Sequence, residues 1–202
     1  VSLAEFQQLL ILFLPSTSFC LFALIILSMR KIQNDELGRL TVDDFKSAEK
    51  RPIVLILDDV RSLNNIGSAF RTADAFRCQS IYLCGITATP PHREIHKTAL
   101  GAEDSVDWKY EKDVVTAIEI LKKDGYTIIG IEQAEGGIML NEFRQDSTKK
   151  YAFIFGHEIN GVSEAALALC DHAIEIPQSG TKHSINISVC VGIVVWEFCR
   201  KW

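Results

Sequence analysis

The stretch that decides the fold is residues 51–84, RPIVLILDDVRSLNNIGSAFRTADAFRCQSIYLC. Within it, residues 53–57, IVLIL, are apolar without interruption and predict a strand that is buried on both faces. Residues 65–76 have the pattern of a helix, and residues 81–84, IYLC, predict a second strand. A strand, a helix and a strand in this order predict two parallel strands, because a helix can carry the chain back to the edge where the first strand began.

The alternation of strands and helices continues to the end of the chain. Further strands are expected at residues 127–131, 151–155 and 173–176, and further helices at residues 113–123, 163–170 and 187–202. The expected fold class is therefore α/β, a mostly parallel sheet with helices on both faces. Residues 29–50 are polar and mixed, and they predict a lead-in helix and linker.

Composition indicates one globular domain, with or without a short extension. The chain has 202 residues, of which 48% are hydrophobic and 23% are charged, and this argues against disorder. The net charge of −5 excludes a generally basic nucleic-acid coat, so any RNA has to bind at a local basic patch or in the groove of an oligomer. No two of the six cysteines have CxxC spacing, which favours reduced thiols and a cytoplasmic location over a disulfide framework.

Residues 1–28 form an apolar amino-terminal extension with three interpretations. Residues 9–27 are almost entirely apolar and approach the length of a membrane span, about 20 residues, although residues 15–18, PSTS, interrupt them. The segment is a non-native extension upstream of a start at Met29, a membrane anchor, or a helix docked on the domain. We favour the first interpretation, because Val1 fits an alternative start codon or a trimmed sequence, and we do not expect a membrane partner.

Common catalytic and metal-binding motifs are absent from the ends of the predicted strands. There is no GxGxxG dinucleotide fingerprint, no GxxxxGK[ST] phosphate loop and no GxSxG elbow. His92 and His96 are one helical turn apart, but without a third ligand a polar loop or a helix start is favoured over a metal site. For Asp58 and Asp59, a turn start or a helix cap is favoured over magnesium. We therefore predict no metal.

The first strand is followed by the segment NIGSAFR, which carries the first candidate site. The Asn64-Asn65 pair can cap the helix, and Gly67 permits the close approach of another backbone. Arg71 lies one turn after this glycine and can offer its planar guanidinium to a phosphate or a ribose. The alternative is a structural salt bridge with Asp58 or Asp74.

The second candidate is the loop FGHEING, residues 155–161, between a predicted strand and the helix that Ser163 is expected to cap. Gly156 and Gly161 lie on either side of Glu158. This suits a loop whose backbone contacts a ligand while Glu158 points into the site. The alternative is an ordinary glycine-rich turn.

The third candidate is IPQSGTKHSINIS, residues 176–188. Ser184, Asn186 and Ser188 alternate with isoleucines just before a very apolar helix. Buried polar side chains need partners, so these residues either satisfy neighbouring backbone or hold a ligand. The first interpretation is favoured, because such residues commonly cap helices.

Taken in order, the three segments resemble the signature motifs of the SpoU (TrmH-type) RNA ribose methyltransferases of the SPOUT superfamily. The resemblance covers about Arg51 to Trp202, and RTADAF at residues 71–76 and KTALGAED at residues 97–104 support it. The departures from the family pattern are Gln178 for the usual Met, Ile185 for Leu, and His157 for a small or polar residue.

This resemblance implies a carboxy-terminal trefoil knot, formed where the chain from Gly180 to Ser188 passes through a loop. It implies a cytoplasmic enzyme that transfers a methyl group from S-adenosylmethionine to a ribose 2′-hydroxyl of RNA, with tRNA favoured over rRNA. It also implies a homodimer, with the last helix in the interface and Arg71 reaching the partner's cofactor site. The expected domains are the extension 1–28, the lead-in segment 29–50 and the methyltransferase domain 51–202.

The resemblance also assigns roles to residues. Arg71 stabilises the developing alkoxide, because an arginine with a pKa above about 12 is a poor base. Asn65 and Glu158 position Arg71 or the substrate, and Ser184 and Asn186 order the cofactor loop and donate to the substrate. The expected cofactor-binding residues are Ile131, Glu132, Gln133, Gly156, Ile176, Ser184 and Asn186.

Three other functions compete with this interpretation. The first is a knotted module that binds RNA or the cofactor without chemistry, and the second is a SPOUT methyltransferase that acts on a base. The third is a membrane-anchored protein, which rests only on residues 9–27. Because Asn65, Arg71, Glu158, Ser184 and Asn186 are all present, we favour the ribose methyltransferase.

Overall fold

The computed structural model describes residues 30–200, so every expectation for residues 1–28 lies outside the described residues. The chain divides into two units, residues 1–39 and 40–202, which are described separately. The described part of the first unit holds a short 3₁₀ helix, η1 (Asn34–Leu37). The expected lead-in helix is therefore not continuous: η1 ends at Gly38, in the left-handed conformation, and a separate short helix follows in the second unit.

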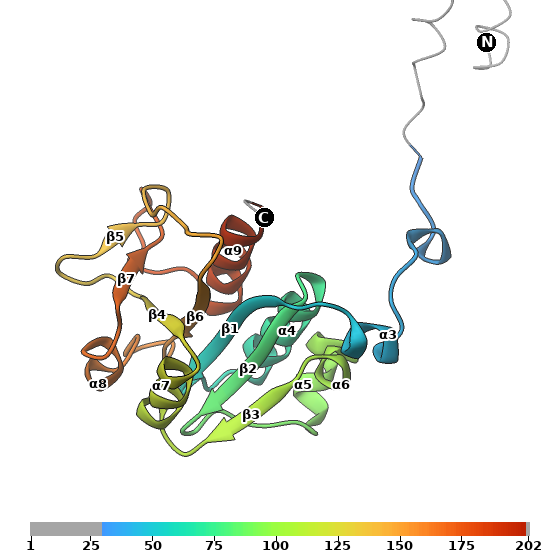
Figure 1. The fold of residues 1–202 in the computed structure, drawn as a ribbon, viewed down its shortest axis with the longest axis horizontal. Helices are drawn as coiled ribbons and strands as arrows, with labels where there is room; N and C mark the ends of the chain where they lie inside the picture. Colours follow the sequence, from blue (N-terminus) through green and yellow to red (C-terminus); the bar gives the residue numbers. More distant parts are fainter. Residues whose placement is uncertain (1–29, 201–202) are drawn as a thin grey trace, which may run out of the picture. The chain divides into compact units, whose positions relative to one another are not determined.

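The second unit is built on one parallel sheet (Figure 1). Its strands are β1 (Arg51–Asp58), β2 (Cys78–Cys84), β3 (Trp108–Glu111), β4 (Tyr126–Ile131), β5 (Ile138–Met139), β6 (Lys150–Phe155) and β7 (His172–Glu175). Its helices are α3 (Val42–Ser47), α4 (Leu63–Ala75), α5 (Arg93–Ala99), α6 (Ala102–Ser105), α7 (Val114–Lys123), α8 (Glu164–Leu167) and α9 (Ile187–Cys199). All adjacent strands of the order β3-β2-β1-β6-β4-β7-β5 are parallel, which confirms the expected α/β class.

Helices cover both faces of this sheet. Ile53, Leu55 and Leu57 of β1 point into one core with residues of α4, α5, α6 and α9. Val54 and Ile56 point into a second core with residues of α7 and α8. The uninterrupted apolar sequence of residues 53–57 in β1 thus follows from the burial of both its faces.

The order of the strands changes direction in the middle of the sheet. The chain builds β1, β2 and β3 outward, crosses to β4, and returns with β6 between β1 and β4. In sheets of this kind, ligands bind outside the carboxyl ends of the strands, where the order reverses. The expected place for a site is therefore the carboxyl ends of β1, β6 and β4.

Helix α4 begins earlier than the sequence predicts. Its N-cap is Ser62, whose side chain accepts from the backbone N–H of Asn65, so neither Asn64 nor Asn65 is the cap. Asn65 lies inside the first turn and is buried. The prediction for Gly67 is confirmed, because a Cβ there would lie 2.3 Å from the backbone oxygen of Ile95 in α5.

Three short elements have no counterpart among the predicted ones: α6, β3 and β5. Helix α5 begins just after His92, where a helix start was one of the two favoured interpretations. Helix α8 is shorter than predicted, and although Ser163 is its N-cap residue, its hydroxyl makes no capping hydrogen bond. Among residues 30–200, no helix is both long and apolar enough to cross a membrane.

Candidate active site

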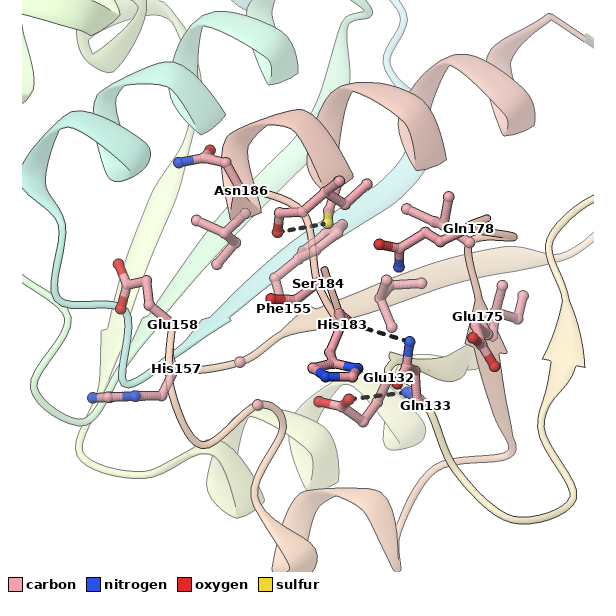
Figure 2. Close-up of a pocket in the computed structure, with 18 of the residues that line it drawn as sticks. Glu132, Gln133, Phe155, His157, Glu158, Glu175, Gln178, His183, Ser184 and Asn186 are labelled. Atoms are coloured by element: carbon pink, nitrogen blue, oxygen red, sulfur yellow. Dashed lines mark hydrogen bonds between the residues drawn. The ribbon is translucent and has the colours of Figure 1, made fainter. Parts of the chain in front are cut away.

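A cavity of about 370 Å³ lies at the carboxyl ends of β4, β6 and β7 (Figure 2). Its walls are residues 131–133 after β4, residues 155–159 and Gly161 after β6, and residues between 174 and 187 that lead from β7 into α9. Its volume is within the range of about 300–1,000 Å³ that is usual for small-molecule sites. The sheet order therefore positions three strand ends around one ligand-sized space.

The seven residues expected to bind a cofactor all line this cavity: Ile131, Glu132, Gln133, Gly156, Ile176, Ser184 and Asn186. Glu158 lines it as well, whereas Asn65 and Arg71 do not. The cavity is also lined by residues that sequence reasoning did not assign to it, among them His157, Glu175, Gln178, His183 and Cys190. Their signal was positional: Glu175 lies at the end of a predicted strand, and the other four lie in or just after segments that follow predicted strands.

A chain of hydrogen bonds joins the three motifs through Asn65 of α4. Asn65 Nδ2 donates to Glu158 Oε1 at 3.3 Å, and Asn186 Nδ2 donates to Asn65 Oδ1 at 3.2 Å. Asn65 is therefore donor and acceptor between two loops that are far apart in sequence. Its burial within α4 is explained by these contacts.

The Glu158 carboxylate binds the amino-terminal end of α4. It accepts from the backbone N–H groups of Arg61 at 3.1 Å and Ser62 at 2.9 Å, in addition to Asn65. Partial burial raises the pKa of Glu158, but these hydrogen bonds outweigh burial and hold the pKa below its usual value. In the described residues no hydrogen bond or ion pair joins Glu158 to Arg71, so the carboxylate positions α4 itself.

Asn186 satisfies local backbone, as the favoured interpretation predicted, whereas the Ser188 hydroxyl is bound by the Asn186 side chain. Asn186 is the N-cap of α9, and its Oδ1 accepts from the backbone N–H of Ser188 at 2.8 Å and from the hydroxyl of Ser188 at 2.6 Å. The Ser184 side chain is different: it lines the cavity and forms no hydrogen bond within residues 30–200. Its hydroxyl is free for a ligand.

Arg71 is exposed on α4, and its guanidinium forms no hydrogen bond or ion pair with any other residue in the described range. The salt bridges considered from the sequence do not form. Asp58 instead accepts from the hydroxyl of Ser163 at 2.9 Å, and Asp74 accepts from the hydroxyl of Ser105 at 2.5 Å. The Arg71 guanidinium is thus available to another molecule.

The metal-ligand candidates from the sequence have structural partners. His92 is the N-cap of α5, with Nδ1 accepting from the backbone N–H of Glu94, and His96 pairs with Glu103. Asp59 lies in a turn, where Oδ1 accepts from the backbone N–H of Ile86 at 2.9 Å. Within residues 30–200 no group of three or more His, Cys, Asp or Glu side chains could hold a metal ion.

Comparison with known proteins places this site in a family. The SpoU rRNA Methylase family matches residues 52–196. An uncharacterized tRNA/rRNA methyltransferase of Synechocystis is 32% identical over 171 residues, which are 82% of this chain and 42% of that protein. The tRNA (guanosine(18)-2′-O)-methyltransferase of Thermus thermophilus is 29% identical over 170 residues, which are 84% of this chain and 85% of that protein.

A solved structure has the same fold. The SpoU methyltransferase AviRb from Streptomyces viridochromogenes, in complex with the cofactor AdoMet, superposes with a TM-score of 0.66 at 23% identity, over 82% of this chain and 63% of that one. The matched residues 52–196 contain β1 except for Arg51, all three candidate motifs and most of α9. The chain belongs to the SpoU rRNA Methylase family.

Proposed function

We propose that this chain transfers a methyl group from S-adenosylmethionine to the 2′-hydroxyl of a ribose in RNA. The observation that carries the proposal is the convergence of the three motifs: the seven residues expected at the cofactor line one cavity, and hydrogen bonds tie that cavity to α4, the helix of Arg71. The relatives' names support the same chemistry, since the Thermus protein is a tRNA 2′-O-methyltransferase.

The residues present fit this cofactor. Ile131, Phe155 and Ile176 give the cavity apolar surface for an adenine ring, and the carboxylate of Glu175 lines it where a positive charge is favoured. The free hydroxyl of Ser184 can serve as a hydrogen-bond donor or acceptor. When bound, S-adenosylmethionine supplies a methyl group on a sulfonium, which is transferred by in-line displacement without a metal.

The chain's own residues prepare the acceptor. Glu158 and Asn65 fix the amino-terminal turn of α4, and Asn186 ties the same turn to the loop before α9. Arg71, two turns further along α4, presents its guanidinium to the ribose hydroxyl and stabilises the alkoxide as the proton leaves, while the neighbouring phosphate accepts the proton. These roles require that α4 keep its position within the protomer.

The site is completed in a homodimer. Arg71 does not line the cavity of its own protomer, so it acts on a cavity supplied by a second copy. Helix α9 carries a surface for that contact: Val189, Ile193 and Trp196 are exposed by 49%, 36% and 56% and recur at helical spacing. The opposite side of α9, including Val191 and Val195, is buried in its own protomer.

The path around the cavity supports the trefoil knot that the family resemblance implies. The segment after β7 lies against the loop after β4, where Gln133 Nε2 donates to the backbone oxygen of His183, and the chain then enters α9, which packs on α4. We assign residues 51–202 to the methyltransferase domain and residues 29–50 to the lead-in segment. Residues 1–28 remain a separate extension.

We propose a cytoplasmic enzyme with tRNA as the favoured substrate. The Thermus relative acts on tRNA, and exposed cations near α4 and α5, among them Arg61, Arg93 and Lys97, can contact a phosphate backbone. A compact RNA with a helix and a loop suits a small dimer that presents two such surfaces.

The test is a methylation assay. The chain is incubated with S-adenosylmethionine labelled in the methyl group and with total small RNA or ribosomal RNA, and the RNA is digested to nucleosides. A labelled 2′-O-methyl nucleoside supports the proposal, and label in tRNA identifies the RNA class. Label on a base would indicate the base-directed alternative, and cofactor binding without label in either RNA would indicate a binding module.

A further inference from the structure

Two consecutive residues after β4 connect that strand to both other walls of the cavity. The Glu132 carboxylate accepts from the backbone N–H of Val162 at 2.9 Å and from that of Gln133 at 2.9 Å. The Gln133 side chain donates through Nε2 to the backbone oxygen of His183 at 3.1 Å (Figure 2). One dipeptide therefore touches the loop after β6 and the loop after β7 at once.

The loop after β6 is shaped to receive the Glu132 carboxylate. Gly161 has a φ of +68°, and a Cβ there would lie 2.0 Å from Glu132 Oε2. Gly156, at the other end of the loop, has no room for a side chain, since a Cβ would lie 2.1 Å from the carbonyl carbon of Gly161. At position 161, glycine is the residue type that allows both this positive φ and the close approach of the Glu132 carboxylate.

The same loop is held at two points by carboxylates. His157 and Gly161 close it by exchanging backbone hydrogen bonds of 2.9 and 2.8 Å. Glu158 then fastens it to α4, and Glu132 fastens it to the end of β4. Backbone N–H groups that bind a carboxylate form charge-assisted hydrogen bonds, which are stronger than neutral ones.

We propose that Glu132 and Gln133 form a bracket that sets the spacing of the three cavity walls, and that both act as positioning residues for cofactor binding. The identity of the cofactor rests on the function proposed above, whereas the bracket rests on the contacts of these two side chains. Loss of the bracket removes no cavity-lining side chain of the loops after β6 and β7, but it lets these two walls move apart.

The test compares Glu132→Gln and Gln133→Ala with Glu135→Gln. Glu135 is an exposed residue of the same loop that does not line the cavity, so its variant removes an equal charge without touching the bracket. Calorimetry measures the Kd for S-adenosylmethionine. Hydrogen exchange of the cofactor-free protein measures protection of the backbone N–H groups in residues 156–163 and 180–186.

We expect Glu132→Gln to raise the Kd about tenfold, because an amide cannot replace a carboxylate that accepts two N–H groups. Exchange in residues 156–163 should accelerate in the same variant. Gln133→Ala should accelerate exchange in residues 180–186 and raise the Kd less. Glu135→Gln should change neither quantity.

A double-mutant cycle gives a second measurement. Gly161→Ala should weaken cofactor binding more in the wild-type background than in Glu132→Ala, because the side chain that would collide with the new Cβ is then absent. Equal effects of Gly161→Ala in both backgrounds would contradict the close contact with Glu132.

The bracket is overturned if Glu132→Gln folds with unchanged exchange in residues 156–163 and an unchanged Kd. Failure of the wild-type chain to bind S-adenosylmethionine would instead refute the proposed function. The hydrogen-exchange measurements would still show whether Glu132 and Gln133 hold the two loops. If Glu132→Gln does not fold, Gln133→Ala decides it, because the Gln133 side chain is exposed and can be removed without loss of core.

Discussion

The side-chain amide of Asn186 donates to the side-chain oxygen of Asn65, 3.2 Å away and 121 positions earlier in the chain. Asn65 in turn donates to Glu158, so a buried asparagine of α4 uses both ends of its amide on two different loops. A substitution that removes it leaves Asn186 Nδ2 without this acceptor and Glu158 without this donor. The three motifs are thus mechanically coupled through one side chain.

We predict that Asn65→Ala lowers the free energy of unfolding by roughly 1–3 kcal/mol, the cost of an unmade hydrogen bond at a buried polar group. Asn186→Ala should also lower it, since the N-cap of α9 is lost. Because the two variants remove one shared bond, the double variant should cost less than the two single costs added together. Urea denaturation measures the free energy of unfolding of the two single variants and of the double variant. The control is Asn64→Ala, which changes an exposed neighbour of Asn65. Strict additivity would contradict the coupling.

Glu158→Gln should destabilise the protein at neutral pH but not in acid. The folded-state pKa of Glu158 lies below its usual value, so its carboxylate stabilises the fold above the unfolded pKa of about 4.3, and this contribution disappears as the pH falls through the folded-state pKa. We expect a cost of about 1 kcal/mol at pH 7, typical of an anion at a helix N-terminus. Unfolding measured from pH 7 down to pH 3 should show the difference from wild type shrinking. Glu119→Gln, on an exposed site of α7, should show no such pH dependence.

Arg71→Ala should lower the methyl-transfer rate by two or more orders of magnitude, a typical loss for one transition-state donor, and leave the Kd for S-adenosylmethionine nearly unchanged.

Ser184→Trp should fill the cavity and abolish cofactor binding while Arg71 is kept. If Arg71 acts across a dimer, co-expression of the two variants restores about a quarter of the sites, because half of the dimers are mixed and each mixed dimer has one complete site.

Recovery of activity in the mixture is the diagnostic result. A mixture that stays inactive would show that Arg71 serves its own protomer. Arg77→Ala, an exposed arginine just beyond the end of α4, is the matched control and should lower the rate far less.

Cys190 should react slowly with alkylating agents, and the cofactor should protect it. Burial raises the pKa of its thiol to about 11, so alkylation should accelerate about tenfold for each pH unit between about 7 and 10. Because Cys190 lines the cavity, S-adenosylmethionine should slow its alkylation. Mass spectrometry of the modified peptides separates it from Cys170, whose pKa burial also raises to about 11 but which lies outside the cavity. Equal protection of both cysteines would contradict the assigned binding site.

Much of the fold follows from the sequence because the central strands are buried on both faces. Residues 53–57 read as a strand without ambiguity, and so do residues 151–155, since only apolar residues fit between two helical layers. Strand β3 lacked this signal because it lies at the edge of the sheet, and Lys109 and Tyr110 in its middle are exposed. Strand β5 has two residues, and its pairing with β7 defines it.

The parts of the candidate site that lie in sequence motifs could be predicted, whereas the parts that depend on tertiary contacts could not. The motif residues Gly156, Ser184 and Asn186 line the cavity as expected. Local capping preference predicted Asn64 or Asn65 as the N-cap of α4. In the structure, the Asn65 side chain instead forms hydrogen bonds with residues 93 and 121 positions away, and Ser62 is the N-cap. No local pattern indicated that Glu132 reaches Val162, because that contact depends on how β4 and β6 lie side by side.

The position of β6 has a consequence for how this protein is made. Strand β6 pairs with both β1 and β4, yet it is the second to last strand in the chain. During synthesis, β1, β2 and β3 can assemble early, but one edge of β1 stays open, and β4 has no neighbour to pair with until residues 150–155 leave the ribosome. Newly made chains therefore pass through a state with unpaired, strongly apolar strand edges, the kind of state that chaperones protect from aggregation.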